Sequence, residues 1–135
     1  MIPMLTLGHN FSPANIHAGG LRYHGAGSVV SQLKQDNWVE AVDIPQLETF
    51  KAATMFAQSE GIIPAPESSH AIATAIREAL KAKEEGVQKT ILFNLSGHGL
   101  IDMAAYDSYI AGDLSNYEVS DEEVARNIST LEKLI

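Results

Sequence analysis

Apolar residues recur at spacings of three and four along most of the chain, which is the pattern of helices with one buried face. The spacing predicts five helices: 28–35, 43–61, 68–86, 101–110, and a last helix that opens at the S-x-x-E capping box of Ser120 and Glu123. Asp43 is the expected cap of the second helix, and Pro45 lies in its first turn. The third helix is expected to begin at a cap formed by Ser68 or Ser69.

Two stretches favour extended structure. The stretch 90–95 (TILFNL) is almost continuously apolar, as expected for a strand covered on both faces, and Trp38–Val42 reads as a shorter strand. Helices between strands are typical of parallel strands, which need a crossover connection. We therefore predict an α/β fold, a partial parallel sheet with flanking helices, in a single domain made of an irregular arm over 1–27 and an α/β region over 28–135. Two or three strands fall short of the usual number of about five or six, so the piece should expose a sheet edge or need a partner.

Composition narrows the class of function. The chain has 135 residues, a hydrophobic fraction of 45% and a net charge of −8, so a folded acidic domain is expected. Such a surface repels phosphate backbones and anionic membranes, which argues against nucleic acid or a membrane as a partner. The chain has no cysteine, so disulfides and thiolate chemistry are excluded. No apolar run approaches the roughly 18–20 residues of a membrane span, and we expect a cytoplasmic protein.

The segment Ser96-Gly97-His98-Gly99 follows the best strand candidate and precedes a helix. Ligands of open α/β sheets bind at this position, because glycines let a ligand approach the backbone and the helix N-terminus offers free N–H groups. The Ser96 hydroxyl adds a donor and an acceptor. A plain turn between strand and helix explains the pattern as well. Neither a phosphate loop nor the G-x-S-x-G elbow of serine hydrolases is present.

Two further segments carry polar or flexible residues in unusual settings. Glu67 lies just before a predicted helix, between proline-stiffened links, where the helix dipole alone would favour a carboxylate. The glycine-rich stretch 19–25 (GGLRYHG) is either a surface loop or a backbone held in special conformations. The five histidines form no compact ligand set, so a catalytic metal is not expected.

Three strings, in this order, carry a family resemblance: GGLRYHG, EGIIPAPESSHAI and KTILFNLSGHG. They resemble the C-terminal region of the tryptophan synthase β chain, and the S-G-H-G loop is typical of the second type of that chain. The resemblance runs from about Leu5 to Leu114 and covers about the last third of the family's length. It implies a fragment of a fold type II pyridoxal phosphate enzyme, a lyase that replaces the hydroxyl of L-serine with indole to give L-tryptophan.

The resemblance also assigns roles to single residues. Glu67 matches the catalytic glutamate beside the cofactor ring. Ser96 matches the serine whose hydroxyl meets the pyridine nitrogen, and Gly97 matches its neighbouring turn. Tyr23 and Gly25 match positions whose backbone carbonyls bind a monovalent cation.

Two positions depart from the commoner form of the family. Arg22 replaces an aspartate that contacts the substrate serine, which leaves the preferred amino acid open. His98 replaces an arginine, a change typical of the second type.

The family's Schiff-base lysine lies in an H-K-x-N segment and its phosphate cradle in a G-G-G-S-N loop, and neither string occurs here. We therefore expect no tryptophan formation by this chain alone. The expected partners are an N-terminal portion of a β chain or further copies of this chain, together with the tryptophan synthase α chain. Two alternatives remain: a non-catalytic, self-associating module derived from the family, and a weak anion site at the Ser96 loop.

Overall fold

The computed structural model describes residues 4–131, which form two compact units. The first unit contains 4–16, Gly20–Asp43 and 117–131, and the second contains His17–Gly19 and Ile44–Asn116. Residues 1–3 of the predicted arm and 132–135 of the predicted C-terminal region lie outside the described part. The predicted division of a single domain into an arm over 1–27 and a region over 28–135 stays a prediction.

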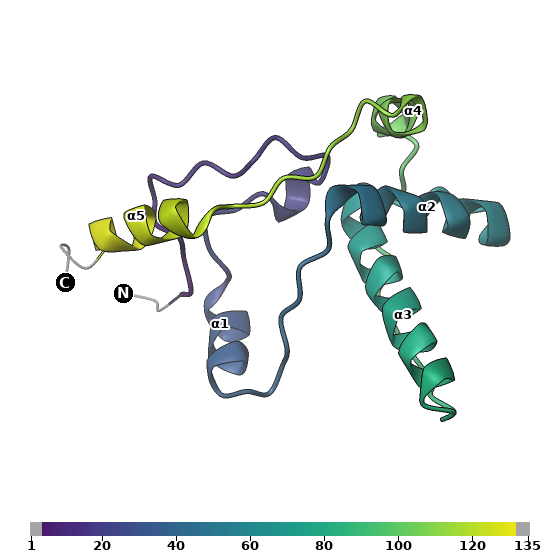
Figure 1. The fold of residues 1–135 in the computed structure, drawn as a ribbon, viewed down its shortest axis with the longest axis horizontal. Helices are drawn as coiled ribbons and strands as arrows, with labels where there is room; N and C mark the ends of the chain where they lie inside the picture. The colour runs from purple at the N-terminus through teal and green to yellow at the C-terminus, as the bar shows by residue number, and fades with distance from the viewer. Residues whose placement is uncertain (1–3, 132–135) are drawn as a thin grey trace. The chain divides into compact units, whose positions relative to one another are not determined.

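The first unit holds two helices, α1 (Ser28–Gln35) and α5 (Asp121–Leu131), both labelled in Figure 1. α1 has the bounds that the apolar spacing predicts. At the start of α5 the Glu123 N–H donates to the Ser120 hydroxyl at 3.2 Å, which confirms the predicted Ser120 cap. The N-terminal segment pairs with the glycine-rich motif through an isolated antiparallel bridge between Thr6 and Gly25.

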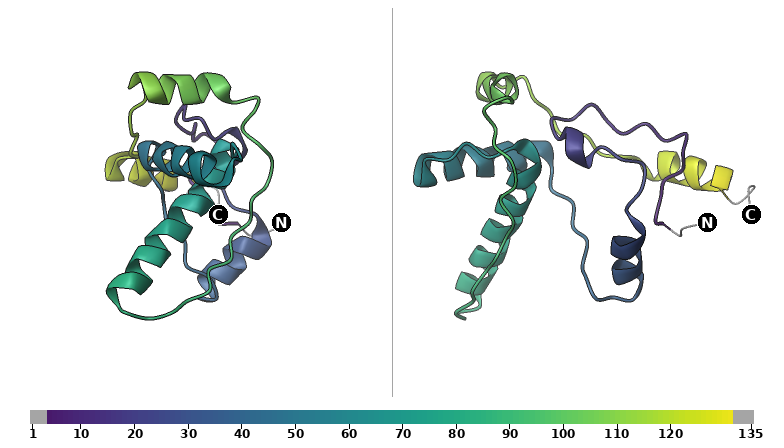
Figure 2. Two further views of the ribbon diagram at one scale, coloured as in Figure 1. Left: turned by 90° about the vertical axis from the view of Figure 1, so that its right-hand side faces the viewer. Right: turned by 180° about the vertical axis from the view of Figure 1, so that it is seen from behind.

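The second unit is built on three helices, α2 (Gln46–Glu60), α3 (Pro66–Glu84) and α4 (Met103–Ala111). α2 and α3 cross and then diverge (Figure 1), and the chain after α3 runs back along that helix toward α4 (Figure 2). All three correspond to predicted helices, with starts displaced by two or three residues. Within the described part of the chain no helix combines the length and the apolar content needed to cross a membrane.

Two small cores hold these helices together. Phe50 of α2, only 1% exposed, lies 5.2 Å from Tyr106 edge to face and 5.7 Å from Tyr109 in a stacked arrangement, measured between ring centroids. The second core joins α2 and α3 through Ala52, Ile72 and Ala73. The small alanine side chains of this second core let α2 and α3 pack closely, while the aromatic rings of α4 cover Phe50 in the first.

The predicted parallel sheet is not found in residues 4–131, because neither proposed strand has a partner there. The segment 90–95 is irregular, and Phe93 packs on Phe56 of α2 with ring centroids 6.0 Å apart, while Leu92 is 94% exposed. Trp38–Val42 is likewise irregular. Residue preference alone cannot make a strand, since a sheet requires neighbouring backbones to satisfy its hydrogen bonds.

The start of α3 corrects a second prediction. The helix begins at Pro66 with Ala65 in the N-cap position, so neither Ser68 nor Ser69 is a cap. Proline is favoured at the first helical position, because its fixed φ suits the helix and its missing N–H needs no partner. Ser68 and Ser69 therefore lie inside the first turn, where their hydroxyls are available for other contacts.

Candidate functional site

Two of the three specific motifs meet in the second unit. The Gly99 N–H donates to the Ile63 carbonyl at 2.9 Å, which joins the Ser96 loop to the link before α3. A Cβ placed on Gly99 would collide with the Pro64 carbonyl and would lie 2.9 Å from Cγ2 of Ile63. Only glycine allows this approach of the two backbones without displacement, so the loop and the link act as one structural piece.

A pair of serines makes the second connection. The Ser96 N–H donates to Oγ of Ser68 at 3.1 Å, and the Ser68 hydroxyl donates in turn to the Ser96 carbonyl. The two hydroxyl oxygens lie 3.2 Å apart. Ser68 is 4% exposed, whereas Ser96 is exposed. Ser96, the serine predicted to face a ligand, is therefore held through its backbone by the buried Ser68 of α3.

Glu67 lies in the first turn of α3, one residue before Ser68, and is half-buried. Its Oε1 atom is 4.0 Å from the position of a Cβ built on Gly19, the first residue of the glycine-rich motif. Gly97 adopts φ +66° in the turn that follows Ser96, and its Cβ position lies 3.6 Å from Cβ of Ala65. The second unit thus brings Glu67, Ser96 and Gly97 to the N-terminal end of α3.

Tyr106 of α4 supports this end of α3 from the core. Its buried hydroxyl donates to the Pro64 carbonyl at 2.6 Å. Burial raises the pKa of this phenol, the bond with Ser69 lowers it and the Asp102 carboxylate raises it again, so the hydroxyl stays protonated and remains a donor. Sequence reasoning missed both Ser68 and Tyr106, although E-S-S-H is part of the specific motif.

Tyr23 and Gly25, the predicted cation ligands, lie in the first unit. Tyr23 is 71% exposed, and the carbonyl of His24 between them accepts the Leu7 N–H at 2.8 Å. A Cβ on Gly25 would lie 2.9 Å from Cβ of Thr6, so the bridge depends on glycine here. Among residues 4–131 no three histidine, cysteine, aspartate or glutamate side chains are grouped to hold a metal.

Arg22, one of the two positions where the chain departs from the commoner family pattern, also lies in the first unit. The side chain is half-buried, and its buried Nε has no hydrogen-bond partner among the described residues. A buried donor without a partner is costly, so this guanidinium is a place where a ligand or another protein segment would be favourable.

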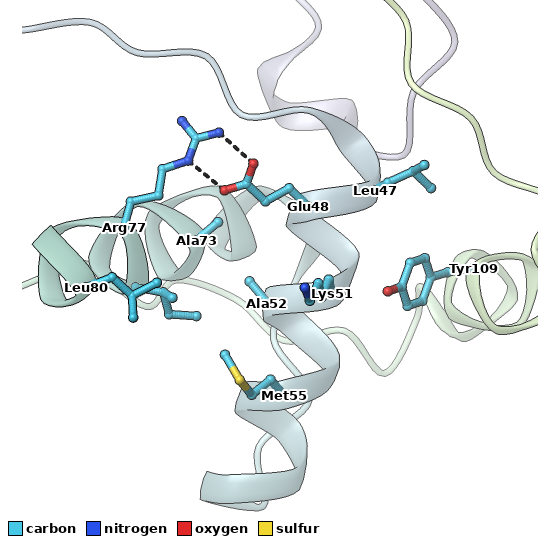
Figure 3. Close-up of a pocket in the computed structure, with 10 residues that line it drawn as sticks. Leu47, Glu48, Lys51, Ala52, Met55, Ala73, Arg77, Leu80 and Tyr109 are labelled. Atoms are coloured by element: carbon cyan, nitrogen blue, oxygen red, sulfur yellow. Dashed lines mark hydrogen bonds and ion pairs between the residues drawn. The ribbon is translucent and has the colours of Figure 1, made fainter.

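A separate hollow of about 550 Å³ opens between α2 and α3. Figure 3 shows Glu48 and Arg77 reaching toward each other across it, with 2.6 Å between Nε of Arg77 and Oε1 of Glu48. The hydrogen bond and the charge of Arg77 hold the pKa of the Glu48 carboxyl below its usual range, against a smaller effect of burial. The remaining walls are mostly apolar, and Met55 and Leu80 are exposed in them.

The known proteins compared with this chain below all come from one family. No family model matches the chain. It is 57% identical to tryptophan synthase β chain 2 of Aquifex aeolicus over 86% of this chain and 27% of that protein. It is 59% identical to the chain 2 protein of Thermotoga maritima (78% and 25%) and 50% identical to that of Aeropyrum pernix (93% and 28%).

The chain thus spans about a quarter of the length of the curated relatives that it matches. The family has fold type II among pyridoxal phosphate enzymes, so the chain carries part of that fold. The three motifs and the identities of 50–59% point to the same family. Two of these motifs meet at the start of α3. On this evidence the chain belongs to the tryptophan synthase β chain family and matches its C-terminal part.

Proposed function

We propose that the chain supplies the C-terminal part of the pyridoxal phosphate site of a tryptophan synthase β chain, the enzyme that replaces the hydroxyl of L-serine with indole. One observation carries the proposal: the Ser96 loop lies on the first turn of α3, which bears Glu67. Residues about 30 positions apart in the sequence are thereby joined in one preformed arrangement. Such preorganisation is what a cofactor site requires.

The residues present fit the ring end of the cofactor. Ser96, an exposed residue, would offer its hydroxyl to the pyridine nitrogen, Gly97 would form the adjoining turn, and Glu67 would lie beside the ring. When bound, pyridoxal phosphate supplies an electron sink for carbanion chemistry. A hydroxyl partner does not favour a protonated ring in the way that a carboxylate would, so Ser96 would restrain this sink and suit elimination over competing reactions.

The other end of the cofactor needs groups that these 135 residues do not contain. The H-K-x-N and G-G-G-S-N strings are absent, so the lysine and the phosphate cradle would come from an N-terminal portion of a β chain. The same portion would offer backbone partners to 90–95, which would then join a parallel sheet. In the complete enzyme the carbonyls of Tyr23 and Gly25 would hold a monovalent cation, and the α chain would be a further partner.

A mixing assay tests this function. The chain is combined with a separately produced N-terminal portion of a β chain, pyridoxal phosphate, L-serine and indole, and tryptophan is measured. We expect tryptophan only in the mixture, with strong losses for Glu67→Gln and Ser96→Ala. Matched exposed controls, Glu60→Gln and Ser59→Ala, should keep the activity of the mixture.

A complete β chain of one of the relatives serves as the positive control for the assay. An inactive mixture alongside an active complete chain would contradict the proposal. Activity that survives both Glu67→Gln and Ser96→Ala would contradict the site assignment instead.

A second candidate function is a non-catalytic module that associates with further copies of itself. It is favoured by the apolar walls of the hollow between α2 and α3 and by Leu92, which is 94% exposed. Exposed apolar surface of this kind marks interaction sites. Light scattering across a range of concentrations tests it: a Leu80→Glu variant should lose an oligomer that persists with or without cofactor, whereas a monomeric chain would contradict it.

A further inference from the structure

We propose that Ser68 is a positioning residue, which clamps both peptide groups of Ser96 and sets the direction of the Ser96 hydroxyl before any cofactor binds. This inference rests on the proposed function for the direction in which Ser96 acts. The clamp itself is a property of this chain alone.

Ser68 behaves differently from most serine and threonine residues of the helices, although Ser31 of α1 likewise bonds outside its helix, donating to the Ala26 carbonyl and accepting the Leu5 N–H. Serine and threonine inside helices usually donate to the carbonyl four residues earlier, as Ser69 does to Ala65 at 2.8 Å. For Ser68 that carbonyl belongs to Pro64, and it already accepts the short bond from Tyr106. The Ser68 hydroxyl leaves its own helix and bonds to a residue 28 positions later.

The donors and acceptors of this pair are determined by chemistry. A serine hydroxyl has one proton and two acceptor sites. The proton of Ser68 goes to the Ser96 carbonyl, which can only accept, and one acceptor site receives the Ser96 N–H at 3.1 Å. Across the 3.2 Å between the two hydroxyl oxygens, Ser68 can therefore only accept.

The direction of the Ser96 hydroxyl proton follows from the donors and acceptors that Ser68 has left. Without a ligand the proton rests on Oγ of Ser68, and with an unprotonated ring nitrogen nearby it can turn outward to that acceptor. No donor of Ser68 competes for the Ser96 oxygen, because its single proton is already bound. Ser68 thus keeps Ser96 available as a donor to a heteroaromatic nitrogen without touching the ligand itself.

Hydrogen exchange of single amides in this 135-residue chain tests the clamp without any cofactor. We expect the residue-96 amide to exchange slowly in the unchanged chain and about tenfold faster in Ser68→Ala, the change that loss of one hydrogen bond produces. Ser69→Ala removes a buried hydroxyl from the same turn and should leave this amide slow. Ser68→Thr, which keeps the hydroxyl, should restore slow exchange.

Ser96→Ala provides a second test in case the Ser68→Ala chain fails to fold. This variant loses only the Ser96 hydroxyl, and its backbone bonds to Ser68 remain, so the residue-96 amide should stay slow. An amide that is fast in the unchanged chain, or equally slow in folded Ser68→Ala, would overturn the clamp.

Cofactor absorbance in the mixture with the N-terminal portion then tests the role toward the ring. Ser68→Ala should weaken pyridoxal phosphate binding about tenfold and shift the pH profile of the absorbance spectrum in the same direction as Ser96→Ala, with recovery in Ser68→Thr. A spectrum and affinity unchanged in Ser68→Ala would overturn the positioning role. If the unchanged mixture binds no cofactor, the proposed function fails, and amide exchange still decides the clamp.

Discussion

Gly99→Ala is the substitution that most directly tests the contact on which the site depends. The added Cβ would meet the Pro64 carbonyl and, at 2.9 Å, Cγ2 of Ile63, so the loop and the link must separate. Overpacking of this kind costs about 1–3 kcal/mol, and loss of the 2.9 Å bond from Gly99 to Ile63 adds roughly 0.5–1.5 kcal/mol. We expect the free energy of unfolding to fall by roughly 1.5–4.5 kcal/mol.

Urea unfolding followed by circular dichroism measures this change, and Gly27→Ala is its control. A Cβ on Gly27 meets no atom within 4 Å, and its backbone has φ −57°, which alanine adopts without strain. Because Gly27 is the N-cap of α1, where glycine is preferred over alanine, Gly27→Ala should still cost no more than about 1 kcal/mol. If Gly99→Ala were as stable as Gly27→Ala, the close approach of the two motif segments would be wrong, and with it the geometry of the proposed site.

Three further predictions concern the surroundings of the site. Tyr106→Phe should cost about 1–2 kcal/mol in the same urea assay, because it leaves the buried Pro64 carbonyl without its donor. Arg77→Ala should cost less than about 1 kcal/mol at pH 7, since its pair with Glu48 is exposed. Because the folded-state pKa of Glu48 is lowered, this difference should be present above its unfolded pKa and vanish as the pH falls through its folded pKa, which a pH series of unfolding curves checks. Leu92→Asp should leave the stability of the isolated chain unchanged, because the side chain is 94% exposed, and should abolish tryptophan formation in the mixing assay.

The helices were predictable because their signals are local. The bounds of α1, the cap of α5 at Ser120 and the end of α2 at Gly61 all follow from residues a few positions apart. The start of α3 was misplaced because two serines compete with Pro66 as the start signal, and the proline prevails.

The sheet could not be predicted by the same means. The apolar run 90–95 predicts a strand, but the segment has no regular structure here, because a strand also depends on which other segments lie beside it. In this chain the run meets Phe56 through Phe93, while Leu92 is uncovered. The N-terminal portion of a β chain that we propose as the partner would complete the burial that this pattern predicts.

The candidate site shows the same division between residue type and context. Motif similarity predicts roles for Ser96 and Glu67 but none for Ser68. The Ser68 hydroxyl resembles an ordinary helix cap until its partner 28 residues away is known. Motif similarity does not predict a role for Tyr106 either, because a tyrosine on an apolar helix face is expected to lie in the core. Both act through single polar atoms that are placed by packing. A motif can thus predict which residue offers a hydroxyl to a ligand. The residues that would orient this hydroxyl are found only when each buried donor in the structure is matched to its acceptor.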